Sequence, residues 1–315
     1  GVLAGLLILG YYSVVAGWTL EYVVASLGNG FAGKGPEDFV ASFQNFSQDP
    51  FRPVIWLLVF LLLTHFIVVK GVKDGIEKSS KVMMPVLFIL ILVLAGCSLS
   101  LPNADLGLEF LLKPDFSKVN ADVFLGAMGQ AFFSLSLGMG CLSTYASYFG
   151  SDTQLGKTAL SVGVIDTFVA ILAGLIIFPA AFSVGIQPDA GPSLIFITLP
   201  NIFNNLSGGR VWGSLFFVFM TFAAFSTIIA VFENIIAMCI DLFGWSRKKS
   251  CLINLIAVII LSLPCALGFN LWSGIQPLGE GSTILDLEDF IISNNILILG
   301  SLVYVVFCCS EKFGW

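Results

Sequence analysis

The stretch 129–148 combines a length and apolarity suited to a membrane span with residues that break a helix. Its middle carries Ser134, Ser136, Gly138 and Gly140 within seven positions. Glycine costs about 1 kcal/mol relative to alanine in a helix interior, and serine offers the backbone a competing hydrogen-bond partner. A break at membrane depth frees main-chain carbonyl groups to coordinate a cation and leaves a half-helix N-terminus facing an anion. The alternative is that these small residues only let two helices pack closely.

Three acidic residues lie within apolar segments, where each ionisable side chain is a functional hypothesis. Asp166 lies well inside its segment, Glu233 lies in a later one, and Glu21 lies near the end of the first. An unpaired charge at the bilayer centre costs at least ~2.5 kcal/mol. Asp166 must therefore be protonated, paired with a cation or in contact with water; a hydrogen bond to a neighbouring helix is the structural alternative.

Ser226 and Thr227 follow Ala223 in another apolar segment. Two adjacent hydroxyl groups and a carbonyl group one turn earlier can offer three hard oxygen ligands to a small cation. Serine and threonine also commonly form hydrogen bonds to their own helix, which is the alternative interpretation.

The composition predicts that helices crossing a bilayer position these residues. The 315-residue chain is 57% hydrophobic and 11% charged, with a mean hydropathy of +0.97, which is typical of a polytopic, all-α membrane protein. A pI of about 4.7 without a basic patch excludes nucleic acid as a partner. The seven cysteines lack metal-ligand spacing and His65 is the only histidine, so we predict packing roles for them and no cofactor.

We predict eight membrane segments, which span residues 1–26, 53–70, 79–100, 122–149, 157–186, 211–243, 251–269 and 287–310. The chain begins inside an apolar segment without a methionine or a basic leader. We therefore expect it to be a fragment of a longer protein.

Lysine and arginine are distributed unevenly between the two sets of alternating loops. Nine of the fourteen lie on one side: Lys70, Lys73, Lys78, Lys81, Lys157, Arg247, Lys248, Lys249 and Lys312. This bias places that side, with the C-terminal end, in the cytoplasm. The outer stretch 190–200 is too apolar for a solvated linker, so we expect it to fold onto the bundle as a lid, with an interfacial hairpin as the alternative.

Five stretches together resemble the bacterial branch of the neurotransmitter:sodium symporter family. They are Y-Y-S-V-V-A-G-W-T-L from Tyr11, F-F-S-L-S-L-G-M-G with T-Y-A-S-Y from Phe132, A-G-P-S-L-I-F-I-T-L-P from Ala190, F-A-A-F-S-T before Glu233, and L-D-L-E-D-F from Leu285. Their shared order and spacing make the resemblance specific.

The resemblance implies a symporter bundle of two inverted five-helix repeats. Residues 1–121 would be the remainder of a truncated first repeat, with three membrane helices and outer loops. Residues 122–315 would be the second repeat, with five membrane helices, the first of them broken, and a lid at about 185–210. The first repeat's own broken helix, which normally supplies half of both sodium sites, would be missing.

The same resemblance implies two sodium sites. Ser134 would bind the first ion, which also touches the substrate carboxylate. The Ala223 carbonyl, Ser226 and Thr227 would bind the second. Asp166 would bind the first ion as well, and it departs from the family pattern, because an asparagine ligand is usual near this position. Ala170 stands where chloride-dependent members have a chloride-binding serine, so we hypothesise that the fixed carboxylate of Asp166 replaces chloride.

The substrate and gate residues follow from the resemblance as well. Tyr12 would hold the substrate carboxylate, and the side-chain pocket would consist of Ile8, Phe133, Ser136, Met139 and Val231. Phe133 would also act as the outer lid of the pocket, and Asp289 would be the acidic half of the outer gate. Asp241 and Tyr148 would form the cytoplasmic gate.

These features predict sodium-coupled import of a small, hydrophobic amino acid by alternating access, independent of chloride. We expect a multi-pass protein of a bacterial inner membrane, with the amino acid, sodium ions and the lipid bilayer as partners and no oligomeric state indicated. The alternatives are a proton-coupled transporter that uses Asp166, a channel or sensor, and a fragment that does not transport. An enzyme would need a nucleophile with a base, or a metal cluster, which one histidine and dispersed cysteines do not suggest.

Overall fold

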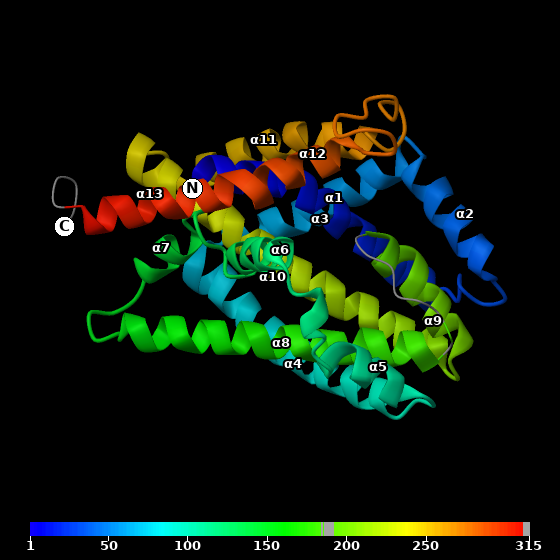
Figure 1. The fold of residues 1–315 in the computed structure, drawn as a ribbon. Helices are drawn as coiled ribbons and strands as arrows, with labels where there is room; N and C mark the ends of the chain where they lie inside the picture. The colour runs from blue at the N-terminus through cyan, green and yellow to red at the C-terminus, as the bar shows by residue number, and fades with distance from the viewer. Residues whose placement is uncertain (184, 186–191, 311–315) are drawn as a thin grey trace.

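The computed structural model describes residues 1–183, 185 and 192–310, and within these ranges its regular structure is helical (Figure 1). The elements are α1 (Val2–Leu27), α2 (Pro36–Ser47), α3 (Arg52–Val69), the π-helical turn η1 (Val72–Glu77), α4 (Lys78–Leu99), α5 (Ala104–Leu112), the 3-10 turn η2 (Phe116–Lys118), α6 (Ala121–Ser134), α7 (Cys141–Ala146), α8 (Leu155–Ser183), the π-helical turn η3 (Leu194–Thr198), α9 (Leu199–Asn205), α10 (Gly209–Phe243), α11 (Arg247–Leu267), α12 (Ile284–Ile291), the π-helical turn η4 (Ile292–Ile296) and α13 (Leu297–Cys309).

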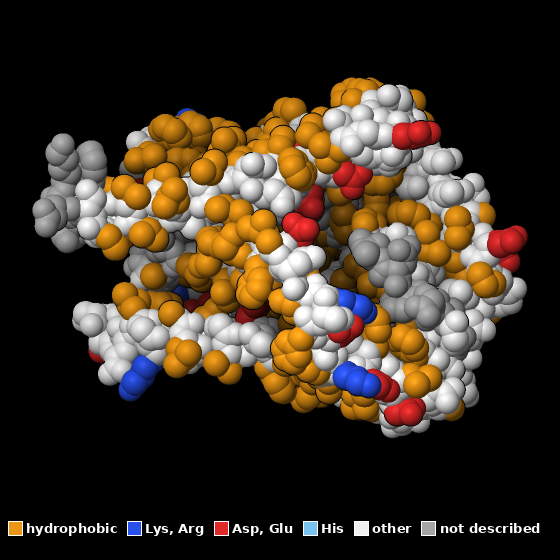
Figure 2. Space-filling view, viewed as in Figure 1, with side chains coloured by type: hydrophobic (Ala, Val, Ile, Leu, Met, Phe, Trp, Pro, Cys, Tyr) orange, Lys and Arg blue, Asp and Glu red, His pale blue; other side chains and the backbone are white. Residues whose placement is uncertain are grey.

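Seven helical runs in the described ranges are long and apolar enough to cross a membrane, and they match seven of the eight predicted segments. The third begins at Val72 rather than at residue 79, because the charged turn η1 continues directly into α4. The predicted end of the fifth, at residue 186, lies outside the described residues. Figure 2 shows hydrophobic side chains over much of the visible face, as expected for a surface in contact with lipid.

The eighth predicted segment, 122–149, is not one helix. It is divided into α6 and α7, which are separated by residues 135–140. This confirms the helix break that the serine and glycine pattern predicts.

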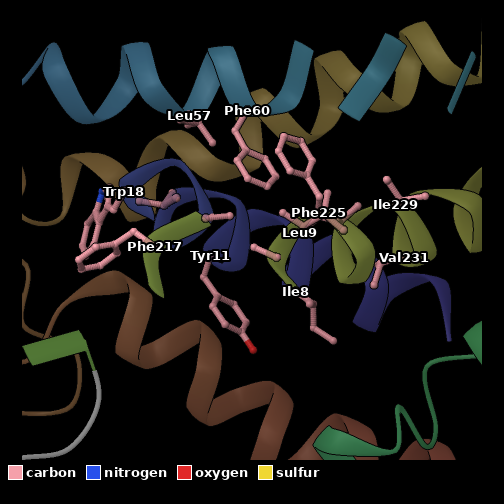
Figure 3. Packing of buried hydrophobic residues seen from close by; sticks show 14 of the residues in the cluster. Ile8, Leu9, Tyr11, Trp18, Leu57, Phe60, Phe217, Phe225, Ile229 and Val231 are labelled. Carbon is pink, nitrogen blue, oxygen red and sulfur yellow. The ribbon is translucent and has the colours of Figure 1, made fainter. Parts of the chain in front are cut away.

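The core is centred on α1, which packs against α3, α10 and α11 (Figures 1 and 3). Phe60 of α3 and Phe225 of α10 stack with ring centroids 4.0 Å apart, and both are buried. Gly17 lets α1 approach α3 closely, since a Cβ atom there would lie 2.8 Å from the Leu57 backbone nitrogen.

The apolar outer loop folds back onto the bundle in its described part, 192–205. Phe196, Leu199 and Ile202 are completely buried. The Phe196 ring meets Trp18 of α1 edge-on, with centroids 5.5 Å apart. Residues 190 and 191 of the expected lid lie outside the described residues.

The close approach at Gly17 yields a stability prediction. Gly17→Ala forces a methyl group against the α3 backbone, and overpacking of this kind costs about 1–3 kcal/mol. We expect a lower thermal unfolding midpoint for the detergent-solubilised protein. Gly96→Ala in α4 is the matched control, because nothing lies within 4 Å of its added Cβ; equal midpoints for the two variants would contradict the packing described.

Candidate ion and substrate site

The break between α6 and α7 has a defined backbone geometry. Ser136, Gly138 and Gly140 adopt positive φ angles of 55°, 78° and 88°. This left-handed conformation is strained for serine and free of strain for glycine. The alternative prediction, close packing by small residues, holds too, since a Cβ at Gly138 would overlap the Leu297 carbonyl oxygen of α13.

Asn234 of α10 satisfies polar groups on both sides of this break. Its Nδ2 donates to the Met139 carbonyl oxygen at 2.9 Å, and its Oδ1 accepts from the Thr144 hydroxyl at 2.8 Å. The side chain is buried, so these bonds replace the hydration that the membrane interior lacks. The Asn234 amide thereby links the unwound segment 135–140 and α7 to the continuous helix α10.

Ser134 and Asp166, both predicted ligands of one sodium ion, are in contact. The Ser134 hydroxyl, at the last residue of α6, donates to Oδ2 of Asp166 on α8. The contact is also the interhelical hydrogen bond considered as the structural alternative. It places a carboxylate and a hydroxyl, both hard oxygen ligands, beside the unwound segment 135–140.

The second predicted set converges on one turn of α10. The Ser226 and Thr227 hydroxyls donate to the Ala223 carbonyl oxygen at 2.8 Å and 3.2 Å. The Tyr12 side chain on α1 interacts with Thr227. The structure therefore brings Tyr12 to the same place as the three oxygens, while the two hydroxyls bond back to their own helix.

Oxygen ligands of this kind are the main candidates for binding a cation here. Among the described residues, no group of three or more His, Cys, Asp or Glu side chains could hold a metal ion. A small hard cation can instead be bound by hydroxyl, carbonyl and single carboxylate oxygens.

The predicted pocket residues lie in three places. Ile8, Met139 and Val231 are buried, and Figure 3 shows Ile8 on α1 and Val231 on α10 on neighbouring faces. Phe133 lines a cavity of about 660 Å³ with Asp289. Ser136 lines a different cavity of about 690 Å³ along α13.

Asp289, predicted as half of the outer gate, contacts one residue of α1 and one residue a turn later in its own helical run. It accepts a hydrogen bond from the Ser293 hydroxyl at 2.9 Å and interacts with the buried Tyr11 side chain. The carboxylate lies at the edge of the cavity that it shares with Phe133, which places the two predicted outer-gate residues together.

Of the two predicted inner-gate residues, Tyr148 contacts the ion pair between Glu233 and Arg247. Tyr148 donates to Oε1 of Glu233 at 2.8 Å, and Arg247 pairs with the same carboxylate at 2.5 Å and 3.1 Å. Arg247 also donates through Nε and Nη2 to the Val68 carbonyl of α3. Asp241 is exposed and takes no part in the ion pairs found among the described residues.

Two residues of this site were not singled out as site residues from the sequence. From the sequence, Arg247 is only one of several loop charges, and Asn234 is not distinguished from its apolar neighbours. A basic residue just after the end of a helix that carries a buried acid, and an amide inside an apolar helix, are the signals that could have indicated them.

Known proteins resemble the chain over nearly its whole length. The model of the sodium:neurotransmitter symporter family matches residues 39–279. An uncharacterized sodium-dependent transporter of Haemophilus influenzae is 35% identical over 99% of this chain and 70% of its own length. One of Bacillus subtilis is 36% identical over 98% of this chain and 68% of its own. The crystal structure of MhsT in complex with L-phenylalanine matches with a TM-score of 0.89 and 40% identity, over 98% of this chain and 70% of that one.

A multi-pass helical bundle with a broken membrane helix and polar oxygens beside the break is typical of secondary transporters. The chain belongs to the sodium:neurotransmitter symporter family, which consists of transporters and not enzymes. The predicted fold class and the family resemblance are confirmed.

Asn234 provides a test of how the break is held. Asn234→Leu leaves the Met139 carbonyl and the Thr144 hydroxyl without their partner, at a cost of about 1–3 kcal/mol per buried group. We expect a clear drop in the thermal unfolding midpoint. The exposed Asn295 on η4 is the control, and Asn295→Leu should leave the midpoint nearly unchanged; a similar drop for both would speak against the role of Asn234.

The inner ion pair makes a prediction about solvent access. Glu233→Gln removes the negative charge that pairs with Arg247. The contact between α10 and the start of α11 should then break more often and admit solvent. The buried thiol of Cys251 on α11 should then react faster with a thiol reagent, as measured by mass spectrometry of labelled peptides. Asp241→Asn should not change this rate. An unchanged rate in Glu233→Gln would show that the Glu233–Arg247 ion pair does not limit solvent access to Cys251.

Proposed function

We propose that this protein is a sodium-coupled symporter that imports a small hydrophobic amino acid by alternating access. The observation that carries the proposal is the contact between Ser134 and Asp166 at the helix break, in a chain that belongs to a family of sodium-dependent transporters. The two-repeat division at residue 121 is part of the same proposal.

The first sodium ion would bind at the break. Ser134 and Asp166 would supply a hydroxyl and a carboxylate oxygen, and the amino-acid carboxylate would complete the shell of the ion. Because ion and substrate then share a contact, each raises the affinity for the other by the same factor. That mutual dependence is the coupling.

The second ion would bind at the turn of α10 that carries Ala223, Ser226 and Thr227. The hydroxyls of Ser226 and Thr227 donate to the Ala223 carbonyl, and each oxygen keeps two lone pairs with which it would bind the ion. Tyr12, which interacts with Thr227, would place its hydroxyl on the substrate carboxylate between the two ions.

The apolar pocket supports a hydrophobic substrate. Ile8, Met139 and Val231 offer no polar atom to a substrate side chain, and methionine adapts to different shapes. The related MhsT structure contains L-phenylalanine. Phe133 would cover the bound side chain from the outside.

Two gates would open alternately. Tyr148, Glu233 and Arg247 would close the inner side, with Asp241 nearby on the same helix, and Phe133 and Asp289 the outer side. With the lysine-rich loops in the cytoplasm, the C-terminal end of the chain would lie inside a bacterial inner membrane. With one gate closed while the other is open, the substrate and sodium site would be reached from only one side of the membrane at a time.

The fixed charge of Asp166 makes a prediction about chloride. In proteoliposomes, uptake of a radiolabelled hydrophobic amino acid should require sodium and be the same with chloride or gluconate. Asp166→Asn should bind sodium about tenfold more weakly in gluconate, equivalent to about 1.4 kcal/mol, because the negative charge is lost.

The control for this experiment is Asp152→Asn, which removes a charge from the loop before α8. Loss of wild-type uptake in gluconate would contradict chloride independence. Uptake driven by a proton gradient without sodium would instead support the proton-coupled alternative.

A further inference from the structure

A cavity of about 600 Å³ lies apart from the site just described, where the C-terminal end of α1 meets α2 and the start of α3. Its floor contains Glu21, which the sequence marked as an unexplained acid in an apolar segment. The Glu21 side chain is only 10% exposed. It forms an ion pair with Arg52 and accepts a hydrogen bond from Nε1 of Trp56 at 2.5 Å.

The carboxylate of Glu21 is therefore already paired, whereas Arg52 keeps Nη1 free of Glu21 and Lys34 has no carboxylate partner among the described residues. The Arg52 side chain is 57% exposed, and Glu21 contacts only its Nε and Nη2 atoms. Lys34 donates to the Ser42 hydroxyl at 2.8 Å and forms no ion pair within the described part of the chain. Two cations and one carboxylate leave the lining of the cavity with one net positive charge, which suits an anion.

The nearby Asp49 does not offset this charge inside the cavity. Its Oδ1 accepts from the backbone N–H groups of Phe51 and Arg52, which caps the start of α3. It is not among the residues that line the cavity.

The walls of the cavity are aromatic. Phe31, Phe39 and Phe46 line it with Tyr22, and the Arg52 guanidinium lies 5.8 Å from the centre of the Phe46 ring. A volume of this size exceeds what a bare inorganic anion would fill, since a water molecule occupies about 30 Å³. The lining therefore favours an anion that carries an apolar body.

The position of the cavity relative to the lipid-facing surface indicates the source of such a molecule. Phe51 and Ile55, which flank Arg52 and Trp56 along α3, are 74% and 56% exposed, and Val24 of α1 is 55% exposed. Tryptophan and arginine beside exposed apolar residues are typical of the membrane interface. Lysine and arginine residues near a membrane surface attract anionic lipid headgroups, with about 1 kcal/mol per residue.

We propose that this cavity binds an anionic phospholipid, with the headgroup phosphate between Lys34 and Arg52 and the start of its apolar chains along the aromatic wall. The bound lipid joins α1, α2 and α3 at this end of the bundle. The binding does not depend on sodium or on a transported amino acid, so its test is separate from that of transport.

The experiment uses the full chain in detergent, titrated with phosphatidylglycerol or phosphatidylcholine, with the thermal unfolding midpoint and native mass spectrometry as readouts. A lipid that binds only the folded protein raises the midpoint with concentration. We expect phosphatidylglycerol to raise it more and to stay bound. Lys34→Gln should weaken phosphatidylglycerol about fivefold, the factor that corresponds to about 1 kcal/mol per basic residue.

Lys118→Gln is the matched control, because Lys118 is an exposed lysine of another loop and pairs with Asp115. Lys34→Arg should retain binding, which separates loss of charge from loss of folding. Equal effects of the two lipids, or of the two glutamine variants, would overturn the proposal. Equal stabilisation by water-soluble glycerol phosphate would overturn it too, in favour of a site for a soluble anion.

Discussion

The structure depends on one constraint: polar main-chain groups that leave a helix at membrane depth need partners other than water. Residues 135–140 meet it through α10 and α13. Asn234 binds the Met139 carbonyl, and Gly138 sits directly against the backbone of α13. This segment can remain unwound because its neighbours have small residues or amides where they approach it.

The long helix α10 connects this break with the other parts of the proposed mechanism. Ala223, Ser226 and Thr227 lie on one of its turns, and Glu233 and Asn234 lie two turns later. Glu233 holds Tyr148 and Arg247, while its neighbour Asn234 holds the unwound strand. A shift of α10 would therefore move the proposed second ion site, the break and the proposed inner gate together.

Much of this could be predicted from local sequence. Hydropathy located the membrane helices, and the serine and glycine spacing located the break, since both signals lie within one segment. The contacts of Arg247 and Asn234 could not be predicted in this way, because each joins helices far apart in the chain and neither residue is unusual in its own segment. Asp241 is predicted from the family pattern alone and stays a prediction; the ion pair that Tyr148 contacts forms on Glu233, two turns earlier on the same helix. Hydropathy likewise marks Glu21 as unusual. It does not indicate that Arg52 forms an ion pair with Glu21 or that Trp56 donates a hydrogen bond to it.

The central claim is that sodium and an amino acid share the site beside Ser134 and Asp166. Isothermal titration of the purified protein with a hydrophobic amino acid, in sodium and in N-methylglucamine at the same ionic strength, tests it most directly. The account predicts measurable binding in sodium that weakens steeply as sodium is withdrawn, with sodium affinity raised in turn by the amino acid. An amino-acid affinity that is the same in both cations would contradict it.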